Sequence, residues 1–453
     1  MRSHTTAVIL VGLFAGASTG LSARPAATDP APTQIAQTYC ATCHNGVTRS
    51  LSGATLDRLD PATIADNPAV WSRAYRQLQA GTMPPVGAPR PDAASRARLL
   101  ASIETALGAD APLPADATNQ EIADRLATLL WNGAPDARLL ADARQHLLTQ
   151  PAALETQVRR MLADPRADAF VSGFFFPWLG LDQLAKAEPD AKYFPEYDAA
   201  LRDAMTTETD LFIRSQLRDD RDPVDLWNAD YTFLNERLAR HYGIAGITGA
   251  QFRRVTLPTP ARYGLLGQGS ILMVTSRHQV GHDSPYTSPA ARSTWVQRHF
   301  LGAPPPMPFP GARPVSPDRP ITPQTRALPA EPCVACHRNF FPLGYGLEHF
   351  DPIGAWRTDD QAGPVDASGA LVDGTPFNGS ADLREALLRY SDAFRTTITE
   401  RLLLYADGKP ANQAQPTPET LVRARQILHG AQPTRWSSVV AAIVRMKPSS
   451  SGS

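Results

Sequence analysis

Cys333-Val334-Ala335-Cys336-His337 is the stretch from which the organisation of this chain is most directly predicted. Two cysteines separated by two residues and followed at once by histidine are the signature of covalent c-type haem attachment. Both thiols form thioethers with the haem, and the histidine becomes an axial ligand of the iron. The same pattern occurs once more, at Cys40-Ala41-Thr42-Cys43-His44. The sequence therefore predicts two covalently bound haem c groups, attached through Cys40, Cys43, Cys333 and Cys336, with His44 and His337 as iron ligands.

The two motif copies use all four cysteines of the chain. A structural zinc site needs four ligands around one metal, and it would give His44 and His337 no reason to follow the cysteine pairs directly. A thioredoxin-like dithiol motif does not require that histidine either. Haem attachment is therefore the interpretation that accounts for every residue of both motifs.

Length and charge narrow the function classes. The chain has 453 residues, of which 43% are hydrophobic, and this is enough for several buried cores. Its 44 basic and 44 acidic residues cancel, so charge gives no argument for binding nucleic acid or an anionic membrane surface. We expect no nucleic-acid partner.

The first residues predict export. Arg2 precedes a short apolar run, Ala7 to Ala17, and Leu21-Ser22-Ala23 offers small residues for cleavage. The apolar run is too short to span a bilayer. Residues 1–23 are therefore expected to be a signal peptide, and the mature protein is expected to be periplasmic or secreted, without a stable membrane anchor.

Residues 32–110 are expected to form a small cytochrome c domain around the first motif. A helix is predicted from Asn67 to Gln79, because apolar residues recur on one of its faces. The following Gly81-Thr82-Met83-Pro84-Pro85 places a methionine on a loop that prolines stiffen. Such a methionine suits the distal sulfur ligand of haem 1, and His/Met coordination suits an iron that relays electrons. The alternative is that Met83 packs in a core.

Residues 118–250 are expected to form a helical scaffold. Thr118 and Glu121 form a predicted capping box at the start of one helix, and Gly133 is expected to end it. The last helix of this region is predicted from Tyr231 to Tyr242.

Residues 251–330 are expected to be largely irregular. A short strand is predicted at Gln251 to Val255, and Ala303 to Pro310 is a proline-rich connector. Residues 331–448 are expected to form a second, helical haem-c domain, with a turn-rich or hairpin piece at Val365 to Gly374. The fold class predicted for the whole chain is therefore mainly α.

The run from Ile271 to Trp295 is dense in side chains with useful chemistry. It contains His278, His282 and Asp283, and glycine and proline within the run disfavour a helix around them. These residues are candidates for the distal side of haem 2, since histidine titrates near neutral pH. The alternative is a polar surface loop.

The residues that follow the second motif are candidates for chemistry at haem 2. Glu348 and Asp351 carry carboxylates that would move protons at an open haem. The alternative is that both carboxylates cap or hydrogen-bond the backbone. Arg357 and Arg292 are expected either to neutralise the haem propionates or to lie on the surface.

The distal position of haem 2 stays open at this stage. The sequence after His337 contains no proline-stiffened methionine comparable to Met83. The sixth coordination position is therefore either free or filled by one of several candidates. These candidates are His349, Tyr405, Met446 and a histidine of the 278–282 loop.

The chain resembles the secreted planctomycete-type cytochromes assembled from several domains of unknown function. The resemblance rests on five segments: Phe170 to Leu181, Asn235 to Gly243, Ser288-Pro289 with Arg292, Cys333 to Arg357, and Leu402 to Lys409. It implies an extracytoplasmic, mainly helical haem-c protein and brings no established reaction. This chain departs from the family pattern in its longer, histidine-richer loop Arg277 to Thr287, and in His349, where asparagine is more usual.

Two function classes follow from these residues. In the first, both irons have two protein ligands and the protein is a pure electron carrier. In the second, the protein is a di-haem oxidoreductase in which haem 1 relays electrons and haem 2 reacts with peroxide, dioxygen or a small-molecule substrate. The large helical scaffold favours the second class, because a carrier needs far less protein around each haem. Either class requires a redox partner protein or another electron acceptor.

Overall fold

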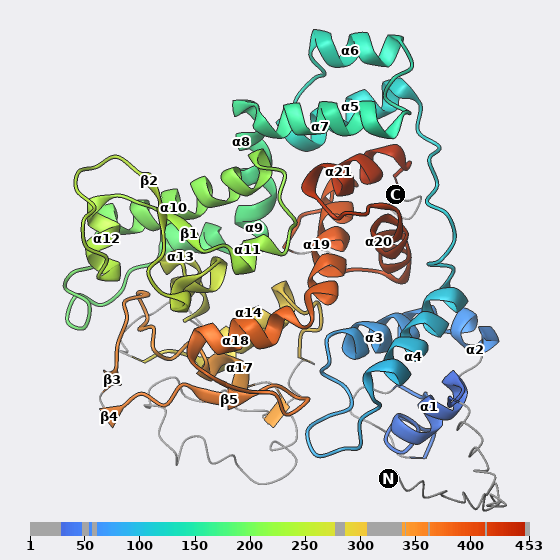
Figure 1. Ribbon diagram of the computed structural model, residues 1–453, viewed down its shortest axis with the longest axis horizontal. Coiled ribbons are helices and arrows are strands. Elements are labelled where there is room, and N and C mark those ends of the chain that lie inside the picture. Colours follow the sequence, from blue (N-terminus) through green and yellow to red (C-terminus); the bar gives the residue numbers. More distant parts are fainter. Residues whose placement is uncertain are drawn as a thin grey trace, which may run out of the picture.

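The computed structural model describes residues 29–47, 54–56, 61–276, 286–305, 338–339, 341–360, 363–412 and 415–448. Within these ranges the chain is mainly helical, as predicted, and its strands form only small two-stranded antiparallel sheets (Figure 1). None of the helices in these ranges combines the length and the apolar character that crossing a membrane requires.

The first four helices form an N-terminal unit around a hydrophobic cluster that Leu421, far along the chain, also joins. The helices are α1 (Pro32–Tyr39), α2 (Pro61–Asp66), α3 (Pro68–Gln79) and α4 (Ala93–Leu107). The predicted helix Asn67 to Gln79 is confirmed, with Pro68 at its first position and Asn67 before it. Asp92 caps the start of α4, and its carboxylate accepts from the Ser95 backbone N–H. The cluster they bury includes Ile35, Trp71, Tyr75, Leu99 and Ile103.

The central region is helical up to α11. Its α-helices are α5 (Asn119–Trp131), α6 (Ala137–Arg144), α7 (Pro151–Ala163), α8 (Asp168–Phe170), α9 (Phe176–Leu179), α10 (Ala199–Arg218) and α11 (Asp225–Asn228). Two 3-10 helices, η1 (Pro165–Ala167) and η3 (Leu181–Lys186), and one π-helix, η2 (Val171–Phe175), lie among them. The capping box of Thr118 and Glu121 is confirmed. Helix α5 ends one residue before the predicted Gly133, because Asn132 takes the left-handed conformation (φ 48°).

The helix predicted from Tyr231 to Tyr242 is wrong in its first third. Tyr231–Leu234 is strand β1, which pairs with β2 (Arg253–Thr256), and α12 (Glu236–Tyr242) begins only after Asn235. Asn235 caps α12 by accepting from the Leu238 backbone N–H at 2.9 Å. The apolar residues of β1 satisfied a helical pattern as well as a strand pattern, since the run is short. The strand predicted at Gln251 to Val255 is confirmed with a shift of one to two residues.

The run Ile271 to Trp295 is not a surface loop at either end. Ile271 lies in α13 (Gly269–Thr275), and Trp295 lies in α14 (Pro289–His299). Short turns η4 (Pro260–Arg262) and η5 (Leu265–Gly267) precede α13. Arg292 lies on α14 with 0% of its surface exposed, so the surface interpretation of Arg292 is wrong. Faces of α13 and α14 are buried in the structure. The polar residues of the run led the sequence analysis to a surface loop instead.

The C-terminal region contains α17 (Pro342–Tyr345), α18 (Gly379–Leu388), α19 (Ser391–Ala406), α20 (Pro418–Gly430) and α21 (Trp436–Arg445), with strands β3 (Asp359–Asp360), β4 (Gly363–Pro364), β5 (Ser368–Ala370) and β6 (Pro376–Asn378). Strands β5 and β6 pair in antiparallel register. The hairpin predicted at Val365 to Gly374 is therefore confirmed.

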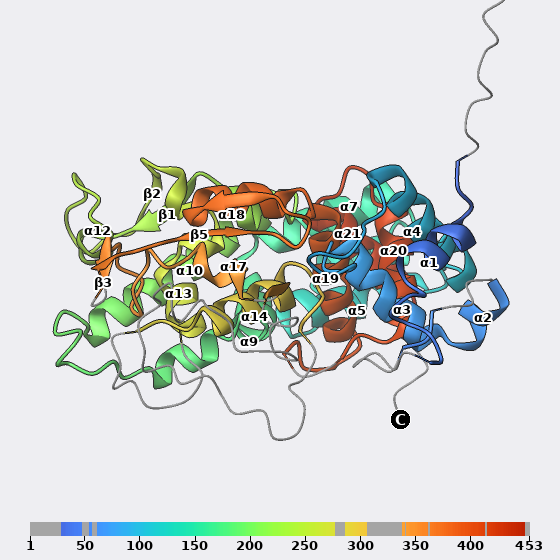
Figure 2. The ribbon, with the colours of Figure 1, turned by 90° about the horizontal axis from the view of Figure 1, so that it is seen from below.

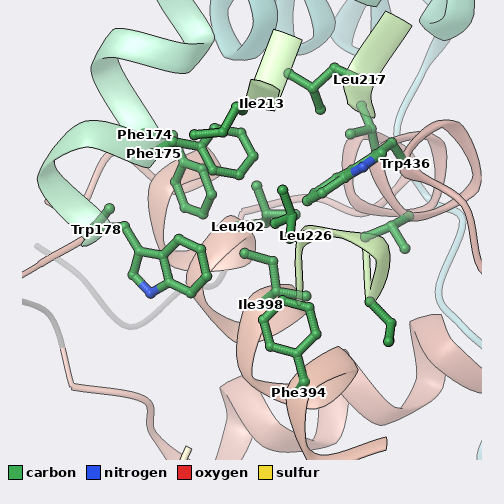
Figure 3. Close-up of a cluster of buried hydrophobic side chains, with 14 of the residues drawn as sticks. Phe174, Phe175, Trp178, Ile213, Leu217, Leu226, Phe394, Ile398, Leu402 and Trp436 are labelled. Carbon is green, nitrogen blue, oxygen red and sulfur yellow. The ribbon is translucent and has the colours of Figure 1, made fainter. Parts of the chain in front are cut away.

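One large core joins the central and C-terminal regions. Figure 3 shows side chains from η2, α9, α10, α11, α19 and α21 converging, with Phe174, Trp178, Phe394 and Trp436 among them. Many of these residues have no exposed surface, and burial of apolar area is the main stabilising contribution to folding. The expected boundary between a scaffold domain and a second haem-c domain therefore does not divide the core.

The N-terminal unit packs against α19 and α20 (Figures 1 and 2). Arg76 of α3 donates from Nε to Oε1 of Glu400 at 3.1 Å, and Glu400 is 2% exposed. Gln79 of α3 donates to Asp392 of α19 at 2.8 Å. These buried polar contacts orient the N-terminal unit relative to the large core.

Candidate functional site

The first Cys-X-X-Cys-His motif continues the end of α1 as one more turn of chain. The backbone N–H of Cys40 donates to Ala36 O at 2.9 Å, and the backbone N–H of His44 donates to Cys40 O at 2.9 Å. Cys40, Cys43 and His44 therefore leave a single turn, which is the arrangement that binding one macrocycle through three side chains requires.

The Cys40 thiol does not have the character of a reactive cysteine. Neither Cys40 nor Cys43 is in a disulfide. Burial, with a further contribution from Cys43, raises the pKa of the Cys40 thiol to about 11. Reactive cysteines have lowered pKa values, because the thiolate is the nucleophile. The raised pKa therefore disfavours thiolate chemistry at Cys40.

The imidazole of His44 follows Cys43 directly in the same turn. Its ring nitrogen Nδ1 is buried and has no hydrogen-bond partner within the described part of the chain. An iron-bound imidazole usually donates its second N–H to a nearby acceptor, so the unpaired Nδ1 does not identify His44 as an iron ligand. What fits covalently bound haem c is the spacing of Cys40, Cys43 and His44 within one turn.

Arg90 binds the backbone carbonyls of the loop that carries Met83, Gly81 to Pro85. The Arg90 guanidinium donates to Gly81 O at 2.8 Å, to Met83 O at 3.4 Å and to Pro84 O. Gly81 has φ +66°, and a Cβ there would collide with the ring of Tyr390, so the turn needs glycine. These hydrogen bonds fix the backbone from which the Met83 side chain extends. A side chain that binds a metal needs such a fixed backbone.

Several predicted site residues lie outside the described residues. They are His278, His282, Asp283, Cys333, Cys336 and His337. The described part of the second haem segment begins at Arg338 and Asn339, directly after the motif.

Glu348 is the centre of a buried ion-pair network. Its Oε1 accepts from Arg292 Nη1 at 3.0 Å, and its Oε2 accepts from Arg357 Nη2 at 3.0 Å and from the Thr287 hydroxyl. Arg292 also donates to Leu347 O at 2.6 Å. Burial lowers the pKa of the Arg292 guanidinium to about 10, which leaves it charged at neutral pH. Glu348 therefore serves to anchor two arginines, and Arg357 is bound to Glu348 rather than exposed at the surface.

Asp351 hydrogen-bonds the backbone, which is the alternative to a proton-transfer role. Its Oδ1 accepts from the backbone N–H groups of Ile353 at 2.9 Å and Ala355 at 2.8 Å. Burial raises the pKa of the Asp351 carboxyl to about 6, against the opposing effect of these hydrogen bonds. The carboxylate closes the turn that precedes Trp356.

Three candidate distal ligands of haem 2 have other partners. The Nδ1 atom of His349 lies 3.1 Å from Arg357 O, and its ring stacks on Trp356 with centroids 4.8 Å apart. The ring of Tyr405 packs against the ring of Phe174, with their centroids 5.4 Å apart. Met446 is 2% exposed and belongs to the large core. Tyr405 and Met446 are therefore placed by packing that needs no iron, whereas the contact of His349 Nδ1 with a backbone carbonyl is also the one that a ligating imidazole makes.

Sequence reasoning missed two residues of the site, Arg90 and Asn339. Asn339 Oδ1 accepts from the Val86 backbone N–H at 3.0 Å and so joins the Met83 loop to the second haem segment. Asn339 follows the second motif by two residues, and Arg90 follows Met83 by seven. Their nearness in sequence to predicted site residues was the one signal that could have identified them. Asn339 is 8% exposed. Nothing in its local pattern distinguished it from a loop residue.

Comparison with known domain families gives three adjacent matches. Residues 117–244 match a model described as "Protein of unknown function (DUF1592)", residues 262–360 match "Protein of unknown function (DUF1588)", and residues 373–445 match "Protein of unknown function (DUF1585)". The three matched domains together fit a multi-domain family. The second motif falls inside the second match, and the first motif precedes all three.

A search of curated proteins and a search of solved structures each returned no match.

Proposed function

We propose that this chain is a periplasmic or secreted di-haem c-type cytochrome that acts as an oxidoreductase. Haem c supplies one-electron chemistry at iron, and its axial ligands and surroundings set the reduction potential. The observation that carries the proposal is the turn Cys40 to His44, which presents two thiols outside any disulfide and one imidazole from a single turn of chain.

The residues of the N-terminal unit would hold haem 1. Cys40 and Cys43 would form the thioethers, His44 would be the proximal ligand and Met83 the distal one. Arg90 holds the three carbonyls of the Met83 loop, so that the methionine is positioned before a ligand is added. A methionine–histidine pair leaves no free coordination position, and this suits electron relay.

The second site would be the reactive one. Cys333, Cys336 and His337 would attach haem 2. Tyr405 and Met446 already have packing partners, which supports a sixth position that is free, or held by His349 or by the 278–282 loop. The buried Glu348 would act as a positioning residue for Arg292 and Arg357, and not as a proton carrier, since its oxygens already accept from both arginines.

Optical and electron paramagnetic resonance spectroscopy of the purified protein tests this function. The proposal expects two haem c groups, one low-spin with a sulfur-to-iron absorption band and one with a high-spin ferric signal. Haem 2 is expected to bind carbon monoxide or cyanide. Two low-spin haems that refuse both ligands in either oxidation state would leave the electron-carrier alternative, and absence of covalent haem would refute both.

A further inference from the structure

The Met83 loop is packed against a tyrosine of the C-terminal region. Gly81 lies against Tyr390, which directly precedes α19, and a Cβ at Gly81 would overlap the ring and the hydroxyl of Tyr390. The cavity that remains between the loop and the C-terminal region measures about 20 Å³, and Gly81, Thr82 and Tyr390 are among the residues that line it. A space of that size holds about one water molecule. The loop and Tyr390 are therefore close-packed.

Tyr390 is itself held by Asp373, which lies in the turn between β5 and β6. The Tyr390 hydroxyl donates to Asp373 Oδ2 at 2.7 Å, and Asp373 Oδ1 accepts from the Thr375 backbone N–H at 2.9 Å. The guanidinium of Arg96 on α4 lies over the Tyr390 ring, 5.5 Å from its centre. Tyr390 is 6% exposed. The ring that Gly81 touches therefore has contacts on its edge and on its face that fix its position.

Asp373 also lies close to Arg90, the residue that binds the loop carbonyls. Arg90 donates to three backbone carbonyls of the loop, and Gly81 O among them is 2.8 Å away. Burial lowers the pKa of the Arg90 guanidinium, and the nearby Tyr390 and Asp373 side chains oppose that shift. A carboxylate close to a partly buried guanidinium favours its charged form. Asp373 thus supports both side chains that contact the loop, Tyr390 through a hydrogen bond and Arg90 through its charge.

We propose that Tyr390 and Asp373 are positioning residues for the distal ligand of haem 1. The inference rests on the proposed function, because it takes Met83 as that ligand. An opening of the loop that withdraws Met83 from the iron also pulls Gly81 from Tyr390 and breaks the Arg90 hydrogen bonds. The C-terminal region therefore sets part of the free energy of loop opening, and it completes the site of haem 1.

Imidazole titration of the ferric holoprotein measures this opening. Imidazole replaces a methionine ligand only in molecules whose loop has opened, so its apparent dissociation constant falls as the open fraction grows. Loss of the sulfur-to-iron absorption band follows the exchange at haem 1 alone, because the proposed function gives haem 2 no methionine ligand.

Two variants test the positioning role. Tyr390→Phe removes the hydroxyl and keeps the ring, and Asp373→Asn removes the charge. Each is expected to lower the dissociation constant of imidazole at haem 1 roughly tenfold, as loss of a hydrogen bond to a charged group predicts. Both variants are expected to keep haem 1 attached, and to show the sulfur-to-iron band before imidazole is added.

Matched controls are Tyr242→Phe and Asp190→Asn. The Tyr242 hydroxyl donates to Glu208 at 2.6 Å, and Asp190 accepts from the Lys192 backbone N–H at 2.8 Å, so each control repeats one of the two changes elsewhere in the chain. Helix α12, which carries Tyr242, lies at the opposite end of the molecule from the N-terminal unit (Figures 1 and 2). The controls are expected to leave the imidazole titration unchanged.

The inference is overturned if the wild type shows the sulfur-to-iron band and both variants keep its imidazole dissociation constant, or if the controls shift that constant as much as the variants do. Either result would leave Met83 as the ligand of haem 1. A wild type without the band would refute Met83 as the ligand and the inference with it, and a protein without covalent haem would refute the proposed function. If Asp373→Asn does not fold, Tyr390→Phe decides, since it removes a single oxygen atom.

Discussion

Replacement of Glu348 by alanine tests the ion pairs that hold the chain after the second motif against α14. Glu348 is 3% exposed, and it pairs with Arg292, which is fully buried, and with Arg357. Alanine leaves the Arg292 charge in the interior without its carboxylate. Breaking a buried ion pair by removing one partner costs about 3–5 kcal/mol. We expect the free energy of unfolding of Glu348→Ala to fall by about that amount.

Denaturant unfolding followed by far-ultraviolet circular dichroism measures this change, with the midpoint and slope compared with the wild type. Glu155→Ala is the control, because Glu155 pairs with Arg159 at 3.5 Å and both side chains are partly exposed. Exposed pairs contribute about 0–1 kcal/mol. A Glu348→Ala protein within about 1 kcal/mol of the wild type would refute the buried-network argument. Glu348→Gln keeps one oxygen acceptor and is expected to fall between the two.

Three further predictions concern the haems and the core. Met83→Ala is expected to leave haem 1 attached and to lower its reduction potential with loss of the sulfur-to-iron band; an unchanged band would point to another ligand. Arg90→Ala is expected to weaken the same band by releasing the loop carbonyls, and Arg138→Gln on exposed α6 is expected to leave it unchanged. Burial raises the pKa of the Glu208 carboxyl to about 7, so the folded protein retains a proton that the unfolded chain loses. The free energy of unfolding is then expected to decrease as pH rises from about 4.5 to about 7, and Glu208→Gln should remove that part of the pH dependence if the assignment is correct.

Helix ends were predictable where a local side chain closes them. The Thr118 and Glu121 box, the helix predicted from Asn67 to Gln79 and the hairpin near residue 370 each depend on contacts within a few residues, and the structure confirms them. The segment Tyr231–Leu234 differs, because its strand pairs with residues 19 to 25 positions later. A run of four residues carries too little periodicity to reveal such a partner.

The same distinction between local and long-range contacts applies to the candidate site. The motif Cys40 to His44 and the loop of Met83 are local patterns, so the sequence suggests their roles directly. The roles of Arg292 and Glu348 depend on a contact across 56 residues, and that of Asn339 on one across 253 residues. Burial and partner identity at such separations arise from packing of the whole chain, and no local pattern encodes them.

The measurement that tests the central claim most directly is the intact mass of the protein purified from the periplasm of a host that attaches haem c, together with the masses of the two motif variants. The proposed function predicts the cleaved polypeptide plus two covalently bound haems. Cys40→Ala/Cys43→Ala and Cys333→Ala/Cys336→Ala should each lose one haem. A wild-type mass without haem, or a motif variant that keeps both haems, would contradict it.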